Sequence, residues 1–330
     1  MNCANCFLPI KDGRKAAHCD VCEKPLHKEC AISDGGTFCD VCYTVKEEQQ
    51  VKPSFEIPSV IRRTHIELYK TCPYAFYMEV IKGMESPPTI YTQLGSDLHE
   101  LFDQASQGQL EKKDMILTFN RLINEYQTQF QLSDAEYQQF YERGIDSIDT
   151  FYTIHKEMAP AIMTETNIQF EVGKDLPKVS ITMDRINRVD GELEMVDWKT
   201  GNVMVGQKLS TDLQAPLYIY AVKEHLGEPV RQFTFYYLHE NKERVFVRDP
   251  FNGDRYTCIV GKRQYEIHLT EAIKEVQRIF SRIIKGDFNI PKDTKKMYFP
   301  CKMCHLREKG ACQGADVESW HQINERREVS

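Results

Sequence analysis

Residues 178–201 read KVSITMDRINRVDGELEMVDWKTG, and this stretch decides the fold of the larger part of the chain. Alternating and β-branched residues predict strands over 179–187 and 192–199, joined by a short turn at Asp190-Gly191. The same kind of pattern over 166–172 predicts another strand just before them. The three segments together predict a meander of antiparallel strands.

The chemistry of the chain is concentrated in this meander. Asp184 lies near the end of one predicted strand and Asp197 at the end of the next, where Lys199 shares its face because alternate residues of a strand point the same way. Carboxylates bind Mg²⁺ or Mn²⁺, the ion activates water, and a lysine orients that water or stabilises developing charge. His99, from a predicted helix over 93–106, is a further candidate ligand. The pattern therefore predicts metal-dependent hydrolysis of a phosphodiester.

Helices and further strands are predicted on both sides of the meander. Strand patterns return at 232–238 and 244–248. Helices are predicted over 66–77, with a break at Cys72-Pro73, over 109–156, 212–225 and 263–284. Helices around a strand meander indicate an α/β core with a helical insertion.

Length and composition exclude several classes of protein. The 330 residues are 41% hydrophobic and 28% charged, which argues against a disordered chain and fits two domains or one large domain with an appendage. No apolar run approaches the roughly 18 residues of a membrane span, and the N-terminus lacks a signal-peptide pattern, so we expect a cytoplasmic protein without membrane contact.

Charge and motif content narrow the choice further. A net charge of −7 excludes a polycationic coat for nucleic acid, although it is compatible with a local basic groove. The chain has no Gly-x-x-x-x-Gly-Lys-Ser/Thr motif, so it has no phosphate-binding loop of a motor protein. If its substrate must be unwound, a separate helicase does so.

Seven of the twelve cysteines lie in the first 42 residues, and with one histidine they form four pairs with two residues between the partners. This spacing is typical of zinc knuckles. The order of the pairs resembles the cross-brace of PHD and RING fingers, while consecutive pairing, as in tandem ribbons, is the alternative. Two zinc ions are expected, one on Cys3, Cys6, His27 and Cys30 and one on Cys19, Cys22, Cys39 and Cys42, with His18 as a spare ligand.

The charge of this finger favours docking of a partner or a structural role. Residues 1–50 carry six Lys or Arg against eight Asp or Glu, a net of −2, and an acidic surface is poorly suited to binding phosphates. We expect the finger over 1–44, a proline-punctuated linker over 45–59 and a second domain over 60–330.

Four short motifs occur in order within the second domain. They are glycine, three residues and histidine at Gly95 and His99, Asp-Arg-Ile at 184–186, Asp-x-Lys-Thr-Gly at 197–201, and Gln-x-x-x-Tyr from Gln214 to Tyr218. Each motif alone is weak. The set resembles the RecB-type branch of the PD-(D/E)XK nuclease superfamily over about residues 60–315, which implies a restriction-endonuclease-like α/β core.

The resemblance also implies roles for individual residues. Glu165 and Glu171 are alternative candidates for an additional acidic member of the site. The other members would be His99, Asp184, Asp197 and the main-chain carbonyl of Trp198 as ligands of Mg²⁺ or Mn²⁺, Lys199 as the catalytic lysine, and Gln214 and Tyr218 as groups that orient the site and the DNA backbone.

A second group of cysteines has one member before the predicted core and three after it. Cys72, Cys301, Cys304 and Cys312 resemble the ligands of AddB and of the CRISPR-associated RecB-like exonucleases, in which four thiolates hold a four-iron, four-sulfur (4Fe-4S) cluster. The gap from Cys304 to Cys312 is longer than in those relatives, and zinc on the same thiolates is the alternative. His305 is a substitute ligand, and Cys258 is expected to be a buried or free thiol.

These features together predict a metal-dependent DNA nuclease that acts as an exonuclease on single-stranded ends. By resemblance, its setting is a bacterial or phage-encoded system of recombination, repair, replication or defence, with a helicase or replication protein docked through the finger. A segment over 292–309, with six Lys or Arg against two acidic residues and with Tyr298 and Phe299, is a candidate track for DNA. The alternatives are a non-catalytic scaffold that binds DNA ends or a helicase, and a zinc-finger regulator.

Overall fold

The computed structural model describes residues 2–5, 9–10, 16–20, 23–33, 36–39, 55–291, 301–302 and 304–312. The chain divides into two compact units, Met1–Glu56 and Ile57–Ser330. No helix in these described parts of the chain is long and apolar enough to span a membrane.

The small unit is built from two short antiparallel pairs of strands. β1 (Ala17–His18) pairs with β2 (Pro25–Leu26), and β3 (Ile32–Ser33) pairs with β4 (Thr37–Phe38). A single helical turn, η2 (Lys28–Cys30), lies between the pairs. Among its described residues, the buried cluster consists of Leu26 and three cysteines, namely Cys3, Cys19 and Cys39. Three of these four buried side chains are candidate metal ligands.

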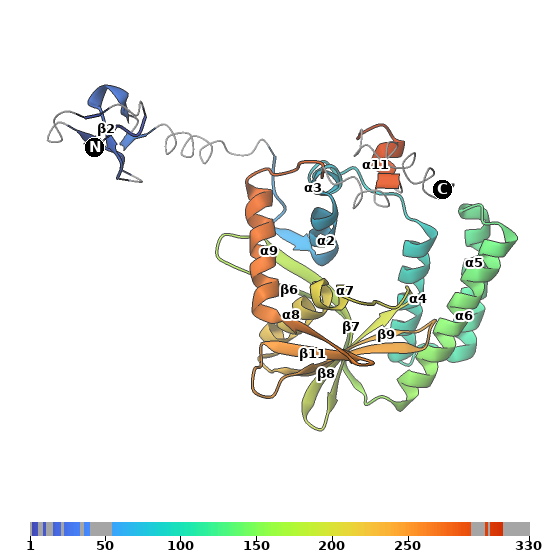
Figure 1. Ribbon diagram of the computed structural model, residues 1–330. Coiled ribbons are helices and arrows are strands. Elements are labelled where there is room, and N and C mark those ends of the chain that lie inside the picture. The colour runs from blue at the N-terminus through green and yellow to red at the C-terminus, as the bar shows by residue number, and fades with distance from the viewer. Residues whose placement is uncertain are drawn as a thin grey trace, which may run out of the picture. The chain divides into compact units, whose positions relative to one another are not determined.

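The large unit alternates helices and strands around one sheet (Figure 1). It opens with a strand and four helical segments: β5 (Val60–Arg62), α2 (Arg63–Thr71), α3 (Pro73–Phe76), η3 (Tyr77–Ile81) and α4 (Ile90–Ser106). The helical insertion is α5 (Lys112–Gln129) and α6 (Asp134–Glu157). The remaining elements are β6 (Ala161–Phe170), β7 (Lys178–Val189), β8 (Glu192–Lys199), α7 (Lys208–Thr211), α8 (Gln214–Leu226), β9 (Val230–Tyr237), β10 (Lys242–Arg248), β11 (Arg255–Val260), β12 (Arg263–His268), α9 (Leu269–Ile284) and α11 (His305–Glu308).

The strands form a mixed sheet in the order β12-β11-β10-β9-β8-β7-β5, with β6 also paired to β7. β5 is parallel to β7 and β8 is parallel to β9, while the other pairs are antiparallel. One hydrophobic core joins the sheet to α8 and α9, and a second joins β8 to α4, α5 and α6. The predicted α/β core with a helical insertion is therefore correct.

Two strands share one edge of β7. β6 pairs along the other edge, from Val179 to Asn187 of β7. β5 pairs with β7 only as far as Ser180, and β8 pairs with it only from Arg185 onward. Since a strand has two edges, β5 and β8 must occupy the edge that β6 leaves open. Their ends face each other across the β7 residues between Ser180 and Arg185, which include Asp184.

One predicted helix begins later than expected. The prediction of a helix over 263–284 is wrong for its first six residues, which form β12 and pair with β11 from Val260 opposite Arg263 to Arg255 opposite His268. Polar and apolar residues alternate over this stretch, and pairing with a preformed strand outweighs its weak helical pattern. α9 then begins at Leu269.

Candidate active site

Asp184 and Asp197 are brought together by the pairing of β7 with β8. Arg185 lies opposite Val196, so the next positions along the two strands place Asp184 opposite Asp197. The regular backbone pairing of β7 with β8 ends at Arg185 and Val196. Beyond it, the backbone N–H of Trp198 donates to the Asp184 side chain, at 2.6 Å from Oδ2. Both carboxylates are buried, with 9% of Asp184 and 2% of Asp197 exposed. Two buried carboxylates therefore face the same small volume.

Lys199 and Gln214 complete a closed network around Asp197. Lys199 Nζ lies 2.6 Å from Asp197 Oδ2 and donates to Gln214 Oε1 at 2.9 Å. Gln214 Nε2 donates in turn to Asp197 Oδ1 at 2.6 Å. The backbone N–H of Gln214 is held by Asp212 Oδ1 at 2.8 Å, at the start of α8. Each member of the network has its orientation set by another.

Asp212 was not among the residues predicted for the site. An aspartate near the start of a helix often accepts a hydrogen bond from the backbone N–H two residues on, and this pattern could have identified it. Its carboxylate fixes the first turn of α8, which carries both Gln214 and, one turn later, the buried Tyr218.

His99 on α4 and Glu165 on β6 also lie beside Asp184. His99 Nδ1 is 3.3 Å from Asp184 Oδ1 and 3.9 Å from Glu165 Oε1. Thr164 lies opposite Arg185 and Thr166 opposite Met183, so Glu165 is opposite Asp184. Its φ of 38° lies in the left-handed region, an uncommon conformation that clusters at functional sites.

Of the two glutamate candidates, Glu165 lies beside His99 and Asp184, and Glu171 does not. Glu171 has 72% of its side chain exposed and lies 3.6 Å from Lys178 Nζ. By contrast, ligand atoms of His99, Glu165 and Asp184 all lie within 4.8 Å of one another. This geometry fits a hard divalent cation, which takes carboxylate oxygens and accepts an imidazole.

Protonation in the site reflects its excess of carboxylates. Burial alone lowers the pKa of His99, but hydrogen bonds and charge from Asp184 and Glu165 outweigh it and raise the value to about 10. Burial raises the pKa of Asp197, and Asp184 adds to this, while Lys199 opposes it. Burial also raises the pKa of Tyr218, and the charge of Asp197 adds to the effect. A bound cation would satisfy the same carboxylate oxygens.

Two arginines tie the helical insertion to β7 and to the end of β8. Arg143 Nε on α6 donates to the Thr200 carbonyl at 2.7 Å, just after Lys199. Arg185, which is 2% exposed, donates through Nη2 to the Ala159 carbonyl at 2.7 Å. Arg185 Nη1 also lies 3.0 Å from His155 Nδ1 on α6. The arginine of the Asp-Arg-Ile motif therefore anchors α6 on the opposite face from Asp184.

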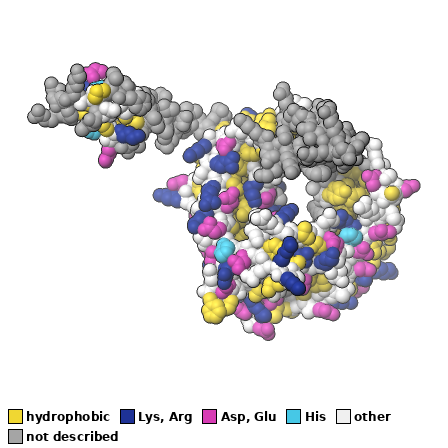
Figure 2. All heavy atoms as spheres, in the orientation of Figure 1, with side chains coloured by type: hydrophobic (Ala, Val, Ile, Leu, Met, Phe, Trp, Pro, Cys, Tyr) yellow, Lys and Arg dark blue, Asp and Glu magenta, His cyan; other side chains and the backbone are white. Residues whose placement is uncertain are grey.

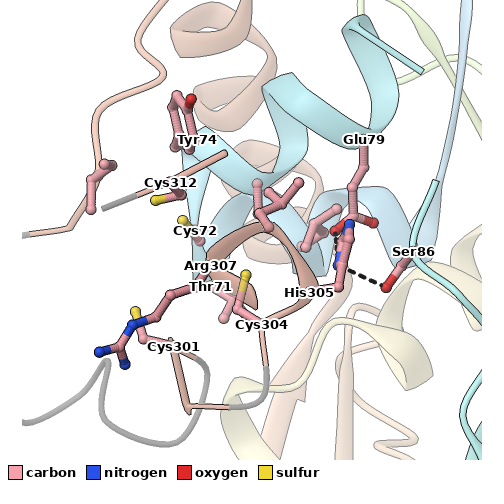
Figure 3. Close-up of a pocket in the computed structure, with 14 residues that line it drawn as sticks. Thr71, Cys72, Tyr74, Glu79, Ser86, Cys301, Cys304, His305, Arg307 and Cys312 are labelled. Carbon is pink, nitrogen blue, oxygen red and sulfur yellow. Dashed lines mark hydrogen bonds and ion pairs between the residues drawn. The ribbon is translucent and has the colours of Figure 1, made fainter. Parts of the chain in front are cut away.

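The four thiols of the second cysteine group line one cavity of about 180 Å³ (Figure 3). Burial raises the pKa of Cys72, and the nearby Cys301 and Cys312 raise it further. Tyr74 Oη donates to the Ala311 carbonyl at 3.0 Å, which fixes the C-terminal segment against α3. Residues separated by more than 200 positions in the chain thus meet at one place.

His305 lines the same cavity, where it contacts Ser86 and Glu79. Its Nδ1 lies 3.0 Å from Ser86 Oγ and 3.8 Å from Glu79 Oε1, as Figure 3 shows. Cys258 is buried in β11, within the main hydrophobic core. The basic segment proposed over 292–309 lies mostly outside the described residues.

In the small unit, three of the four ligands expected for one zinc ion are among the described residues. Ligand atoms of Cys3, His27 and Cys30 lie within 4.8 Å of one another, with His27 Nδ1 3.9 Å from Cys30 Sγ. This grouping has the interleaved order and not the consecutive one. Cys19 and Cys39 of the other group are both buried. Cys6, Cys22 and Cys42 lie outside the described residues.

Comparisons with known proteins address the large unit. A family model described as the PD-(D/E)XK nuclease superfamily matches residues 63–312. No curated protein is significantly similar to the chain. A solved chain described as "Crystal structure of SSO0001" is 15% identical, with a TM-score of 0.28, and the match covers 64% of this chain and 93% of that one.

Proposed function

Because the chain belongs to the PD-(D/E)XK nuclease superfamily, we propose that it is a RecB-type, metal-dependent deoxyribonuclease acting on single-stranded DNA from its ends. The observation that carries the proposal is the intact network of Asp184, Asp197, Lys199 and Gln214. A structural role alone does not require two buried carboxylates and a lysine at one point, because burying charges is costly. Metal-dependent hydrolysis of a phosphodiester uses such groups to hold the ion and to offset developing charge.

Each residue of the site has a distinct task in this proposal. His99, Glu165, Asp184 and Asp197 would hold Mg²⁺ or Mn²⁺, with the Trp198 carbonyl as a further ligand. When bound, the ion would activate water and offset the charge that develops on the phosphate.

Lys199 acts beside the carboxylates. Asp197 and Gln214 hold its ammonium, and the Phe235 ring lies 5.2 Å from Nζ, so the cation is preorganised to orient water or stabilise the transition state. Tyr218 and Gln214 support this arrangement from α8.

The test of this function compares linear with circular single-stranded DNA in Mg²⁺ and in Mn²⁺. We expect cutting of the linear form only, and we expect Asp197→Ala to abolish it, because the variant loses both a ligand and the anchor of Lys199. Asp114→Ala, at an exposed carboxylate on α5, is the matched control. Cutting of both substrates would make the protein an endonuclease, and cutting of neither would favour a DNA-end or helicase scaffold.

We propose that the four-thiol cavity holds a 4Fe-4S cluster. Tetrahedral zinc with bonds of about 2.3 Å would bring four sulfurs to roughly 3.8 Å from one another. Among the described residues, no three of these thiols come within 4.8 Å of one another, whereas the Cys3, His27 and Cys30 group does. The wider spacing supports a cluster, in which iron atoms lie between the thiolates.

Metal analysis of anaerobically purified protein tests both cysteine sites. We expect about four iron atoms and two zinc ions per chain, with a visible absorbance that Cys301→Ala removes. The zinc count should stay the same in that variant, since the proposed zinc ligands lie in the other unit. Zinc in place of iron at full occupancy would contradict the cluster. In this scheme the small unit docks a partner, such as a helicase.

A further inference from the structure

Two adjacent arginines lie where β5 ends and α2 begins, and no function has yet been assigned to them. Arg62 is exposed and Arg63 is half-buried. Neither makes a hydrogen bond or an ion pair with another described residue. In a chain with a net charge of −7, acidic partners are plentiful, and Arg188, for example, is paired with Glu228 at 2.8 Å. The pair is therefore not needed for local charge balance.

Helix stability does not explain the pair either. The first turn of α2 contains no acidic residue, and the Arg62 side chain makes no capping hydrogen bond. Positive charges at this end of a helix oppose its dipole. His65 in the same turn has a buried Nδ1 without a hydrogen-bond partner among the described residues. The sequence thus places unpaired cations where the helix itself disfavours them.

The strand register places these arginines at the edge of β7 that β5 shares with β8, the catalytic edge, where Asp184 and Lys199 also lie. Arg62 is the last residue of β5 and pairs with Ser180 of β7, at the same edge where β8 ends with Lys199. The start of α2 and the end of β8 consequently face each other across the β7 segment that contains Asp184. The charge of Arg63 also reaches Tyr218, where it opposes the burial that raises the pKa of the hydroxyl.

We propose that Arg62 and Arg63 bind backbone phosphates of single-stranded DNA next to the scissile bond, an inference that rests on the nuclease function proposed above. The catalytic centre itself is rich in carboxylates and repels a polyanion. Cations just outside it offset that repulsion and fix the strand, and a guanidinium binds phosphate oxygens through two parallel hydrogen bonds. Figure 2 shows the large unit hollowed on one face, between the α9 side and the side of α4, α5 and α6.

The experiment measures binding and cleavage with the full-length protein. Binding of a short fluorescein-labelled single-stranded DNA is titrated in Ca²⁺ at several salt concentrations for the wild type, Arg62→Gln, Arg63→Gln and the double variant. Arg263→Gln is the matched control, because Arg263 is exposed on β12 at the far edge of the sheet. Cleavage in Mn²⁺ then gives KM and kcat for each variant.

We expect each arginine variant to bind about tenfold more weakly. The slope of log affinity against log salt should become shallower by about 0.7 for each arginine, the value for one phosphate contact on a single strand. KM should rise with little change in kcat, Arg63→Lys should keep the salt slope, and the melting temperature should not fall, because the helix loses unfavourable charges. Arg263→Gln should behave as the wild type.

The outcomes separate this inference from the function on which it rests. A double variant with wild-type affinity, salt slope and KM, in a protein that still cuts DNA, would overturn the role of the two arginines and leave the nuclease intact. A wild-type protein that neither binds nor cuts single-stranded DNA would overturn both. A fall in melting temperature that matches the loss of binding would make the pair structural and would also reject the inference.

Discussion

Replacing Lys199 by alanine is expected to reduce the rate of DNA cleavage by roughly 10³-fold or more, because Asp197 and Gln214 hold its ammonium in place to stabilise the charge that develops on the phosphate. The loss has a second component. Asp197 is 2% exposed, and without Lys199 its buried carboxylate would keep the hydrogen bond from Gln214 and the charge of His99 but lose the ammonium 2.6 Å away. Its pKa, already raised by burial, would rise further, and affinity for the divalent ion would fall.

Titration of Mn²⁺ separates the two components. Activity of Lys199→Ala that returns at high Mn²⁺ would mean that the lysine mainly supports the metal ligand. Activity that stays low at saturating Mn²⁺ would mean that it acts on the reacting phosphate. Lys262→Ala, at an exposed position in the turn before β12, is the matched control. Cleavage at the wild-type rate by pure Lys199→Ala protein would refute the assignment of the catalytic lysine.

The centre of the site was predictable because its geometry is local. Asp184, Asp197 and Lys199 belong to two strands joined by a two-residue turn, so alternation along the chain already places them on one face. Gln214 could be added only through the resemblance to a family. Its contact with Lys199 depends on how α8 returns to the sheet, which no local pattern encodes.

Features that depend on distant pairing were not predictable in this way. The choice of Glu165 over Glu171 follows from the register of β6 on β7, which places Glu165 opposite Asp184, whereas Glu171 follows the last residue of β6. Such a register depends on pairing between strands and not on the local pattern of either one. Arg63 reaches the catalytic edge only because β5 pairs in parallel with β7, across more than a hundred residues of intervening chain.

The cysteine cavity has the largest expected effect on stability. If Cys72 and Cys301 are ligands of one cluster, the cluster closes a loop of 301 − 72 = 229 residues that contains every strand of the sheet from β6 to β12. By analogy with a cross-link, closing such a loop removes chain entropy from the unfolded state worth about 5 kcal/mol. We therefore expect Cys301→Ala to lower the free energy of unfolding by about that amount, with a correspondingly lower midpoint in urea.

Cys258→Ala is the matched control for this experiment, since it makes the same substitution at a thiol that is 1% exposed in β11 but lies outside the cavity. It should cost about 1 kcal/mol, the usual penalty for a small change in a packed core. Tyr74 and Ser86 would still contact the C-terminal segment in the Cys301 variant, but two hydrogen bonds of about 1 kcal/mol each cannot replace the closure. Equal midpoints for the two alanine variants would show that the four thiols do not clamp the domain, and the cluster would then be at most peripheral to its fold.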